Sequence, residues 1–262
     1  MKYKLWENGT PYYNAQYMQP EPTLIPYLLN NDKTNSVVIV FPGGGYSQHT
    51  KHECEPIAKR LNEAGLSAFV LNYRLRPYHH PAILTDALRA IQYVRFHAEQ
   101  FHIDPEKIGI IGFSAGGHLA STVIGQYNLG TDNGDEIDRV SSRPNACALC
   151  YAVILLGDER HQGSKINLLG ENPDAALVKF LSGENNIRED CPPVFLWHTA
   201  EDSVVHVDNS LRMALALKEK KIPFELHVFP YGYHGLGLSN DNEHVKQWFP
   251  LLINWLNLNE FL

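Results

Sequence analysis

The stretch Lys107-Ile-Gly-Ile-Ile-Gly-Phe-Ser-Ala-Gly-Gly-His-Leu-Ala120 decides how this chain folds. Residues 107–112 form an apolar run typical of a strand buried on both faces of a sheet, and a helical period begins directly after Ser114. A sharp strand-to-helix turn exposes the serine hydroxyl, and there the amide of Ala115 can donate to a developing oxyanion. In this context Gly112-Phe-Ser-Ala-Gly116 predicts a nucleophilic serine. The alternative, a helix N-cap serine in a Gly-rich turn, is disfavoured by the flanking strand and helix.

Apolar runs alternate with amphipathic stretches on both sides of this turn, from Val37 to the C-terminal end. The alternation predicts a doubly wound α/β fold, in which a mostly parallel central sheet is covered by helices on both faces. Further strands are expected at 36–41, 66–75, 147–156, 194–199 and 224–229, and helices at about 54–64, 81–101, 203–221 and 242–256.

Two segments depart from this alternation. The first 35 residues, rich in Tyr and Pro, are expected to add antiparallel edge strands, which brings the sheet to about eight strands. Residues 157–190 lose strand character and contain one predicted helix, about 174–181, flanked by Gly and Asn. We interpret 157–190 as a small lid-like excursion above the sheet, so that 1–262 forms a single domain.

A serine hydroxyl is a poor nucleophile at neutral pH, so a base must take its proton and a carboxylate must orient that base. Functional side chains in open α/β sheets follow the carboxyl ends of strands. Asp202 lies in the loop after the 194–199 strand and is the predicted acid. Glu201 precedes the turn and Asp208 falls inside the next predicted helix, so both are weaker candidates. The alternative role for Asp202 is a cap of that helix.

His234 lies between Gly232 and Gly235 in the loop after the last apolar strand. A histidine in such a loop can turn its ring toward the sheet centre, and the chain order serine, acid, histidine is the one that strand-end triads of this kind follow. His234 is therefore the predicted base, with a solvated loop histidine as the alternative. His118, one turn into the helix after the serine, and His198, inside a strand, are interpreted as packing or supporting groups.

Pro42-Gly-Gly-Gly-Tyr46 follows the first buried strand. Consecutive glycines let backbone amides turn toward one point, as donors must in order to stabilise a tetrahedral intermediate. A Gly-rich turn can also cradle phosphate, but the sequence has no G-x-x-x-x-G-K-[ST] and no G-x-G-x-x-G that opens a helix directly. Nucleotide binding is therefore the weaker interpretation, and we expect oxyanion donors here and no cofactor.

Charge and cysteine content argue against several classes of function. The chain has 22 Lys and Arg against 29 Asp and Glu, a formal net charge of −7, and lacks the clustered cations that bind a phosphate backbone. Its four cysteines are expected to be reduced and mostly buried, and no histidine pair is completed into a metal site. The N-terminus has no hydrophobic signal core and no apolar run approaches about 18 residues. We expect a cytoplasmic protein without nucleic-acid or membrane partners.

With these residues placed, the chain resembles the esterase branch of the alpha/beta-hydrolase superfamily. That branch includes hormone-sensitive-lipase-like carboxylesterases and small acetyl esterases that act on acetylated sugars or xylan. The resemblance runs from about Val37 to the C-terminus. It rests on Pro42-Gly-Gly-Gly-Tyr46, Asn72-Tyr-Arg-Leu75, Gly112-Phe-Ser-Ala-Gly-Gly-His118, Pro192-Pro-Val-Phe-Leu-Trp-His198, Asp202-Ser-Val-Val205 and His234-Gly-Leu-Gly237.

The resemblance implies the alpha/beta-hydrolase fold and a role for each site residue. It makes Ser114 the nucleophile, Asp202 the acid and His234 the base, with the amides of Gly44, Gly45 and Ala115 forming the oxyanion hole. Two positions depart from the pattern. The lipase-like motif usually begins with His where this chain has Pro42, and His206 stands where similar sequences often carry Pro. Neither departure removes a catalytic group, but both concern the shape of the pocket.

The leading hypothesis is a carboxylesterase that removes short acyl groups, above all acetyl from a sugar, through an acyl-enzyme on Ser114. A peptidase or acyl-peptide hydrolase with the same triad is one alternative, although such enzymes usually carry an extra domain that filters peptides. A non-catalytic ligand receptor on this scaffold is another, and it predicts a broken triad. The oligomeric state stays open, a homo-oligomer included. We expect the pocket walls to come from Tyr46, 73–80 and 157–190.

Overall fold

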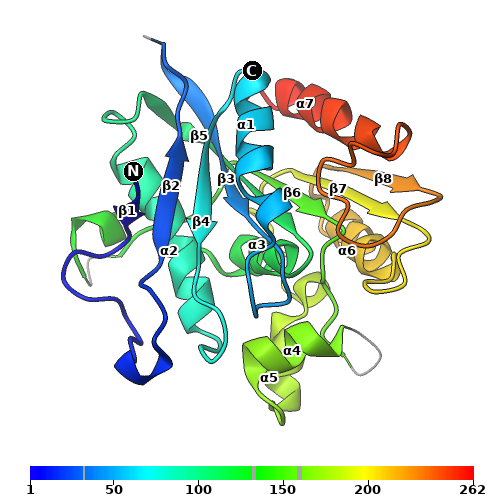
Figure 1. Cartoon of the computed structure of the whole chain (residues 1–262), viewed down its shortest axis with the longest axis horizontal. Coiled ribbons are helices and arrows are strands. Elements are labelled where there is room, and N and C mark those ends of the chain that lie inside the picture. Colours follow the sequence, from blue (N-terminus) through cyan, green and yellow to red (C-terminus); the bar gives the residue numbers. More distant parts are fainter. Residues whose placement is uncertain (32, 132–133, 158–160) are drawn as a thin grey trace.

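The computed structural model describes residues 1–31, 33–131, 134–157 and 161–262, and the strands of this part of the chain form one eight-stranded sheet (Figure 1). The strands are β1 (Tyr3–Lys4), β2 (Thr23–Tyr27), β3 (Asn35–Phe41), β4 (Ser67–Asn72), β5 (Ile103–Phe113), β6 (Ala146–Cys150), β7 (Val194–Thr199) and β8 (Phe224–Phe229). Their order across the sheet is β1-β2-β4-β3-β5-β6-β7-β8. β1 pairs with β2 and β2 with β4 antiparallel, whereas the other neighbours are parallel. The predicted fold class, with antiparallel strands added by the N-terminal segment, is confirmed.

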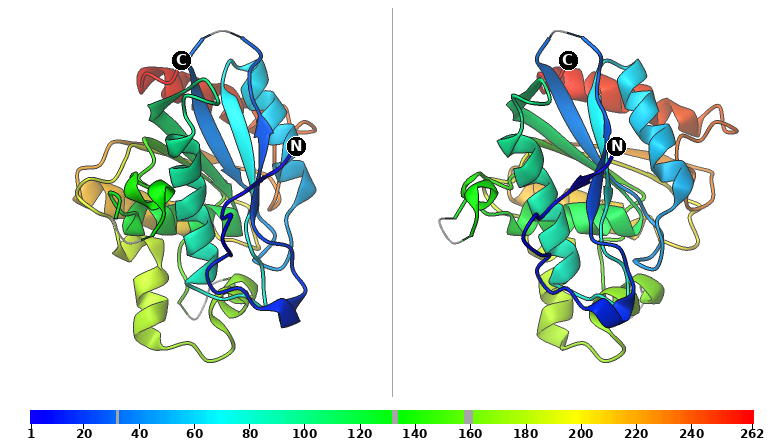
Figure 2. Two further views of the ribbon diagram at one scale, coloured as in Figure 1. Left: turned by 90° about the vertical axis from the view of Figure 1, so that its left-hand side faces the viewer. Right: turned by 60° about the vertical axis from the view of Figure 1, so that its left-hand side comes forward.

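Helices cover both faces of this sheet. They are α1 (Glu55–Glu63), α2 (Ala82–Phe96), α3 (Ala115–Gln126), α4 (Gln162–Leu169), α5 (Ala175–Leu181), α6 (Asp208–Glu219) and α7 (Trp248–Leu258). The apolar sides of α1 and α7 belong to one core, and those of α2, α3 and α6 to the other. Figure 2 shows α1 and α2 on opposite sides of the sheet. Among the described residues, no helix combines the length and apolar character that crossing a membrane requires.

Strand β3 shows how the sequence builds these two cores. All seven of its residues are buried, as expected for a central parallel strand. Because side chains alternate along a strand, Val37, Ile39 and Phe41 join the core of α2 and α3. Val38 and Val40 join the core of α1 and α7. Full burial of an aliphatic side chain stabilises a fold by about 1.5–3 kcal/mol, so the carboxyl end of β3 is held in a rigid frame.

The strand predicted over 147–156 ends at Cys150, so that prediction is wrong beyond this residue. The rest of the run is buried but irregular. Its backbone finds partners outside the sheet, because the amides of Ile154 and Leu155 both donate to Oδ1 of Asn209, at 2.9 and 3.0 Å. A side-chain oxygen from α6 thus takes the place of a neighbouring strand, which an apolar run alone does not reveal.

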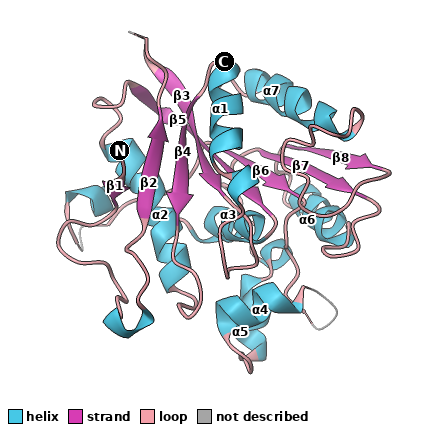
Figure 3. Ribbon diagram, viewed as in Figure 1, coloured by secondary structure: helices cyan, strands magenta, loops and turns pink. Residues whose placement is uncertain are grey.

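The 157–190 stretch contains two helices where the sequence predicts one. α5 matches the predicted helix, whereas α4, an eight-residue helix that begins Gln-Gly-Ser, is not predicted; residues 158–160 lie outside the described part. Figure 3 shows both helices apart from those that cover the sheet, near the carboxyl end of β3. The single-domain organisation of 1–262 stays a prediction.

Candidate active site

Ser114 occupies the turn between β5 and α3 with an unusual positive φ of 50° and a ψ of −116°. Strand and helix approach too closely here for side chains on the flanking residues. A Cβ on Gly112 would lie 2.2 Å from the Gly116 carbonyl oxygen, and one on Gly116 would lie 2.1 Å from the Phe41 carbonyl oxygen. The Ser114 hydroxyl makes no capping bond to α3 and bonds to His234 instead, so the N-cap alternative does not hold.

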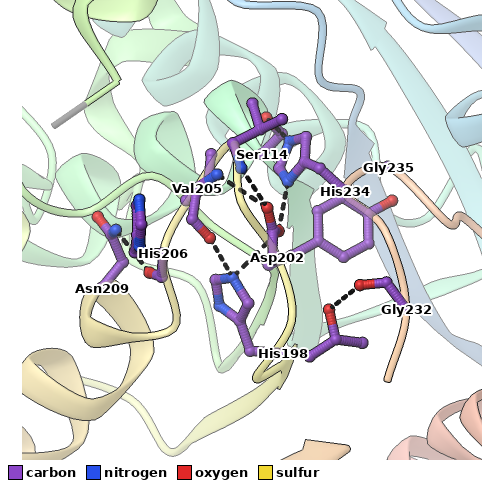
Figure 4. A network of polar contacts seen from close by, with 12 residues as sticks. Ser114, His198, Asp202, Val205, His206, Asn209, Gly232, His234 and Gly235 are labelled. Carbon is purple, nitrogen blue, oxygen red and sulfur yellow. Dashed lines mark hydrogen bonds and ion pairs between the residues drawn. The ribbon is translucent and has the colours of Figure 1, made fainter. Parts of the chain in front are cut away.

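Three side chains from three strand ends meet in a hydrogen-bonded row (Figure 4). Ser114 Oγ lies 2.8 Å from His234 Nε2, and His234 Nδ1 lies 2.6 Å from Asp202 Oδ2. Ser114 and Asp202 are only 6% and 3% exposed, so water screens these bonds little. The structure therefore brings the predicted nucleophile, acid and base together, and their catalytic roles stay a prediction.

Asp202 is surrounded by donors. Its Oδ1 accepts from the backbone amides two and three residues further along, at 2.9 Å each, and its Oδ2 accepts from His234 and, at 3.3 Å, from His198. Burial raises the pKa of the Asp202 carboxyl, but the hydrogen bonds from His198 and His234 outweigh burial and hold this pKa below its usual range. Asp202 is therefore ionised. It does not cap α6, because that helix begins only at Asp208 and not near 203 as predicted.

His198 supports the acid directly. Its Nε2 faces two acceptors, the Asp202 carboxylate at 3.3 Å and the Val205 carbonyl oxygen at 2.7 Å, so Nε2 carries the proton. Its Nδ1 lies 2.8 Å from the Ser210 hydroxyl, which then donates to it. The sequence predicts a supporting role for His198 but not this contact with Asp202. The available signal is a lone imidazole in a buried apolar strand, because such a group needs polar partners.

The rival residues take other positions. Glu201 Oε2 accepts from the Gly232 amide at 2.9 Å and so holds the loop that carries His234. His118 is buried, with Nδ1 2.7 Å from the Tyr46 hydroxyl and Nε2 2.8 Å from the Leu181 carbonyl oxygen. Burial lowers the pKa of His118 to about 4, so its ring is neutral. It joins the glycine loop to α5, as a packing group does.

Two side chains hold the glycine loop that begins with Pro42 in place of His. The Tyr73 hydroxyl donates to the Pro42 carbonyl oxygen at 2.5 Å, and the Gly43 amide donates to Oε2 of Glu53 at 2.8 Å. The second departure, His206, has an exposed side chain, and its carbonyl oxygen accepts from the first turn of α6. These contacts explain how the chain keeps its loops in place despite both departures.

The amides predicted to form the oxyanion hole have hydrogen-bonding capacity left for a ligand. Within the described ranges, the N–H groups of Gly44, Gly45 and Ala115 donate to no protein acceptor. Gly44 has a φ of +119°, and a Cβ there would lie 2.2 Å from the Gln48 carbonyl oxygen, so this position requires glycine. The three amides are free to bind the oxygen of a ligand, and their oxyanion role stays a prediction.

A cavity of about 340 Å³ opens on Ser114. It is lined by Gly44, Gly45, Ser47, Thr50, Glu53, Ser114, His161, Gly163, Asn167, His234 and Gly235. The 157–190 excursion forms part of the wall, as predicted. It does so through α4, whose Asn167 donates to the Gly45 carbonyl oxygen at 2.7 Å. Tyr46 is fully buried against His118, and neither it nor any residue of 73–80 lines this cavity, contrary to the prediction. A larger cavity beside Lys165 and Arg212 contains none of the triad residues.

The arrangement is equipped for acyl transfer. Because ionised Asp202 can only accept, His234 Nδ1 carries the proton and Nε2 is free to take the proton of Ser114. The oxygen of an attacked carbonyl can then be stabilised by free amides in the same cavity. Among the described residues, no group of three or more His, Cys, Asp or Glu side chains is arranged to hold a metal ion.

Comparison with known proteins places relatives of this chain among esterases. Residues 26–217 match the family model described as BD-FAE. Endo-1,4-beta-xylanase B of Butyrivibrio fibrisolvens is 39% identical over 248 residues, which are 93% of this chain and 39% of that protein. The acetylxylan esterase of Xylanibacter ruminicola is 33% identical over 240 residues, 89% of this chain and 47% of that protein. The chain thus spans less than half the length of these two curated relatives.

Solved structures share the whole architecture. An acetyl ester-xyloside bifunctional hydrolase from Caldicellulosiruptor lactoaceticus is 50% identical, with a TM-score of 0.97 over 100% of this chain and 97% of that one. A propionate-bound thermophilic esterase from Thermogutta terrifontis is 27% identical, with a TM-score of 0.77 over 93% of this chain and 91% of that one.

Proposed function

Because the chain belongs to the BD-FAE family, in the esterase/lipase branch of the alpha/beta-hydrolase superfamily, we propose that it is a serine carboxylic-ester hydrolase. Its substrates are short-chain acyl esters, above all acetyl groups on sugars. One observation carries the proposal: the row of Ser114, His234 and Asp202 opens on a cavity that also contains unoccupied glycine amides.

The proposed reaction has two halves. Ser114 Oγ attacks the ester carbonyl while His234 Nε2 takes the hydroxyl proton, and the resulting imidazolium is stabilised by ionised Asp202. The amides of Gly44, Gly45 and Ala115 receive the oxyanion, and each such donor typically lowers the barrier by about 2.7–4 kcal/mol. His234 then gives its proton to the leaving alcohol. In the second half His234 Nε2 takes a proton from the water that attacks the acyl-enzyme, and return of this proton to Ser114 Oγ releases the carboxylic acid.

The cavity supports a short acyl group and a polar alcohol. Every described residue that lines it is glycine or polar, so a long acyl chain finds no apolar wall there. His161 and Asn167 lie in the wall from the excursion, where they can meet hydroxyl groups. The acetylxylan esterase and the acetyl ester-xyloside hydrolase among the relatives support the same substrate class, an acetylated sugar.

Three other functions are less favoured. A non-catalytic receptor predicts a broken triad, whereas all three groups are present and hydrogen-bonded. A peptidase stays an alternative with the same chemistry. Xyloside cleavage, named for the hydrolase from Caldicellulosiruptor lactoaceticus, commonly uses a pair of carboxyl groups. The described lining of this cavity supplies one, Glu53, whose two oxygens are already hydrogen-bonded.

An ester panel tests the proposal. We expect turnover of p-nitrophenyl acetate and of acetylated xylo-oligosaccharides, a steep fall from acetyl to octanoyl esters, and little turnover of an aminoacyl anilide. Ser114→Ala should abolish every activity, with Thr34→Ala, an exposed hydroxyl outside this lining, as the matched control. Preferred cleavage of the anilide would favour the peptidase, and tight ligand binding without turnover would favour the receptor.

The cellular setting is part of this proposal. All four cysteines are free thiols, Cys54 half-buried and the others buried, which supports a reducing compartment such as the cytoplasm. A small ester is the proposed partner.

A further inference from the structure

Glu53 is a buried carboxyl group that the proposed reaction does not use. It ends a short 3₁₀ turn (Lys51–Glu53) just before α1, is 1% exposed, and still lines the cavity beside Ser114. Its Oε2 accepts from the Gly43 amide at 2.8 Å, directly before the proposed oxyanion donors. Its Oε1 accepts from the Tyr151 hydroxyl at 2.6 Å.

Tyr151 extends this contact to the histidine loop. Its hydroxyl oxygen accepts from the Gly237 amide at 2.9 Å, three residues after His234. Its ring lies edge-on to the His234 imidazole, with ring centroids 5.2 Å apart. Glu53 is therefore the middle of a hydrogen-bonded chain that joins the glycine loop to the loop of the base.

The charge of Glu53 has no strong cationic partner. Among the described residues its one ion-pair partner is His52, whose Nε2 is 4.0 Å away and whose side chain is half-exposed, and no Lys or Arg bridges to Glu53. The other polar group that faces it, Tyr151, is neutral at ordinary pH because burial raises its pKa. Burial also raises the pKa of Glu53, whereas a charged His234 lowers it. A buried, poorly paired carboxylate costs stability, so its presence here asks for a functional reason.

We propose that Glu53 is a positioning residue of the ester hydrolase, acting in two ways. Its carboxylate fixes Gly43, and thereby the following amides of Gly44 and Gly45, in the place where the oxyanion forms. Its negative charge lies in the same small cavity as the His234 ring, so it favours the imidazolium that forms there during the reaction, because opposite charges attract. This inference rests on the proposed function and adds no bond-making step to it.

The test compares Glu53→Gln and Glu53→Ala with Glu55→Gln, an exposed control two residues away. Glutamine keeps an acceptor for the Gly43 amide and removes the charge. We expect Glu53→Gln to lower kcat for p-nitrophenyl acetate roughly tenfold with little change in KM, and Glu53→Ala to lower kcat by roughly a hundredfold, as loss of an oxyanion donor does. Binding of a trifluoromethyl ketone, whose adduct carries an oxyanion, should weaken in parallel. Glu55→Gln should match the wild type.

Stability separates positioning from a merely structural role. The folded-state pKa of Glu53 is raised, so the folded protein binds the proton more tightly than the unfolded chain, and the ionised form opposes folding at neutral pH. Glu53→Gln should therefore unfold at an equal or higher urea concentration at pH 7 while it loses activity.

Unchanged kcat in Glu53→Gln, or a fall in kcat that tracks a fall in stability, would overturn the inference while the esterase proposal stands. A wild-type protein that hydrolyses no ester would overturn the proposed function, and this inference with it.

Discussion

Replacing Asp202 by Asn is the sharpest perturbation of the site, because it keeps the shape and removes the charge. Each oxygen of the carboxylate accepts from two donors: backbone amides at Oδ1, and His234 with His198 at Oδ2. An amide has one oxygen and one NH2 group. Whichever way the Asn side chain is turned, its NH2 group faces two N–H donors.

The effect on catalysis follows from the tautomer. If the NH2 group faces His234, the imidazole accepts at Nδ1 and carries its proton on Nε2, which points at Ser114 and can no longer act as the base. Loss of the correct tautomer in a serine triad lowers kcat about 10⁴-fold, or about 5.5 kcal/mol of barrier. If the NH2 group faces the loop instead, the amides of exposed Val204 and buried Val205 lose their acceptor, and the buried one costs about 1–3 kcal/mol.

The assay measures both quantities on Asp202→Asn. The imidazole can change its tautomer whereas the two backbone amides cannot change, so we expect the NH2 group to face His234 and kcat for p-nitrophenyl acetate to fall about 10⁴-fold. The free energy of unfolding in urea at pH 7 should fall by about 1–3 kcal/mol, because His198 loses one of its two acceptors. Asp241→Asn, an exposed carboxyl in the segment after the histidine loop, is the matched control and should change neither. A kcat within tenfold of the wild type would refute the role given to Asp202.

Further outcomes follow from the same geometry. Gly44→Ala should lower kcat by about a hundredfold, because its Cβ clashes with the Gln48 carbonyl oxygen and displaces the loop. Circular dichroism should show that the fold is retained. A fully active variant would show that the loop can accommodate the methyl group. The pKa of His118 falls from 6.5 to about 4 on folding, so stability should drop by about 3 kcal/mol as the pH falls from 6.5 to 4. Urea unfolding of the wild type and of His118→Gln across this pH range measures the loss. The same pH dependence of the unfolding free energy in both proteins would contradict it. Asn167→Ala removes the hydrogen bond from α4 to Gly45. Loss of about 1 kcal/mol of binding free energy should raise KM for acetylated xylo-oligosaccharides about fivefold. An unchanged KM would show that α4 takes no part in substrate binding.

Much of the fold could be predicted because parallel strands are buried on both faces and read as continuous apolar runs. The strands predicted at 194–199 and 224–229 are β7 and β8. The candidate triad can be predicted in the same way, because the carboxyl ends of parallel strands meet at one edge of the sheet. Ser114 directly follows β5, and Asp202 and His234 lie in the loops after β7 and β8.

What could not be predicted depends on partners far away in the chain. The apolar residues after Cys150 leave the sheet because Asn209, more than fifty residues on, accepts their amides. Glu53 stands in the polar turn Lys-His-Glu, where nothing local marks it as buried; its partners Gly43 and Tyr151 come from two other strand ends. Tyr46 is predicted to line the pocket, but its hydroxyl bonds to buried His118.

The identity of the acylated residue tests the proposed acyl transfer through Ser114 most directly. The wild-type protein is mixed with p-nitrophenyl acetate, quenched in acid within the first turnover and digested for peptide mass spectrometry. We expect one acetyl group on Ser114. This label should be absent from Ser114→Ala, and it should form more slowly in His234→Ala, which lacks the base that takes the Ser114 proton. Acetylation at another residue, or ester turnover retained by Ser114→Ala, would contradict it.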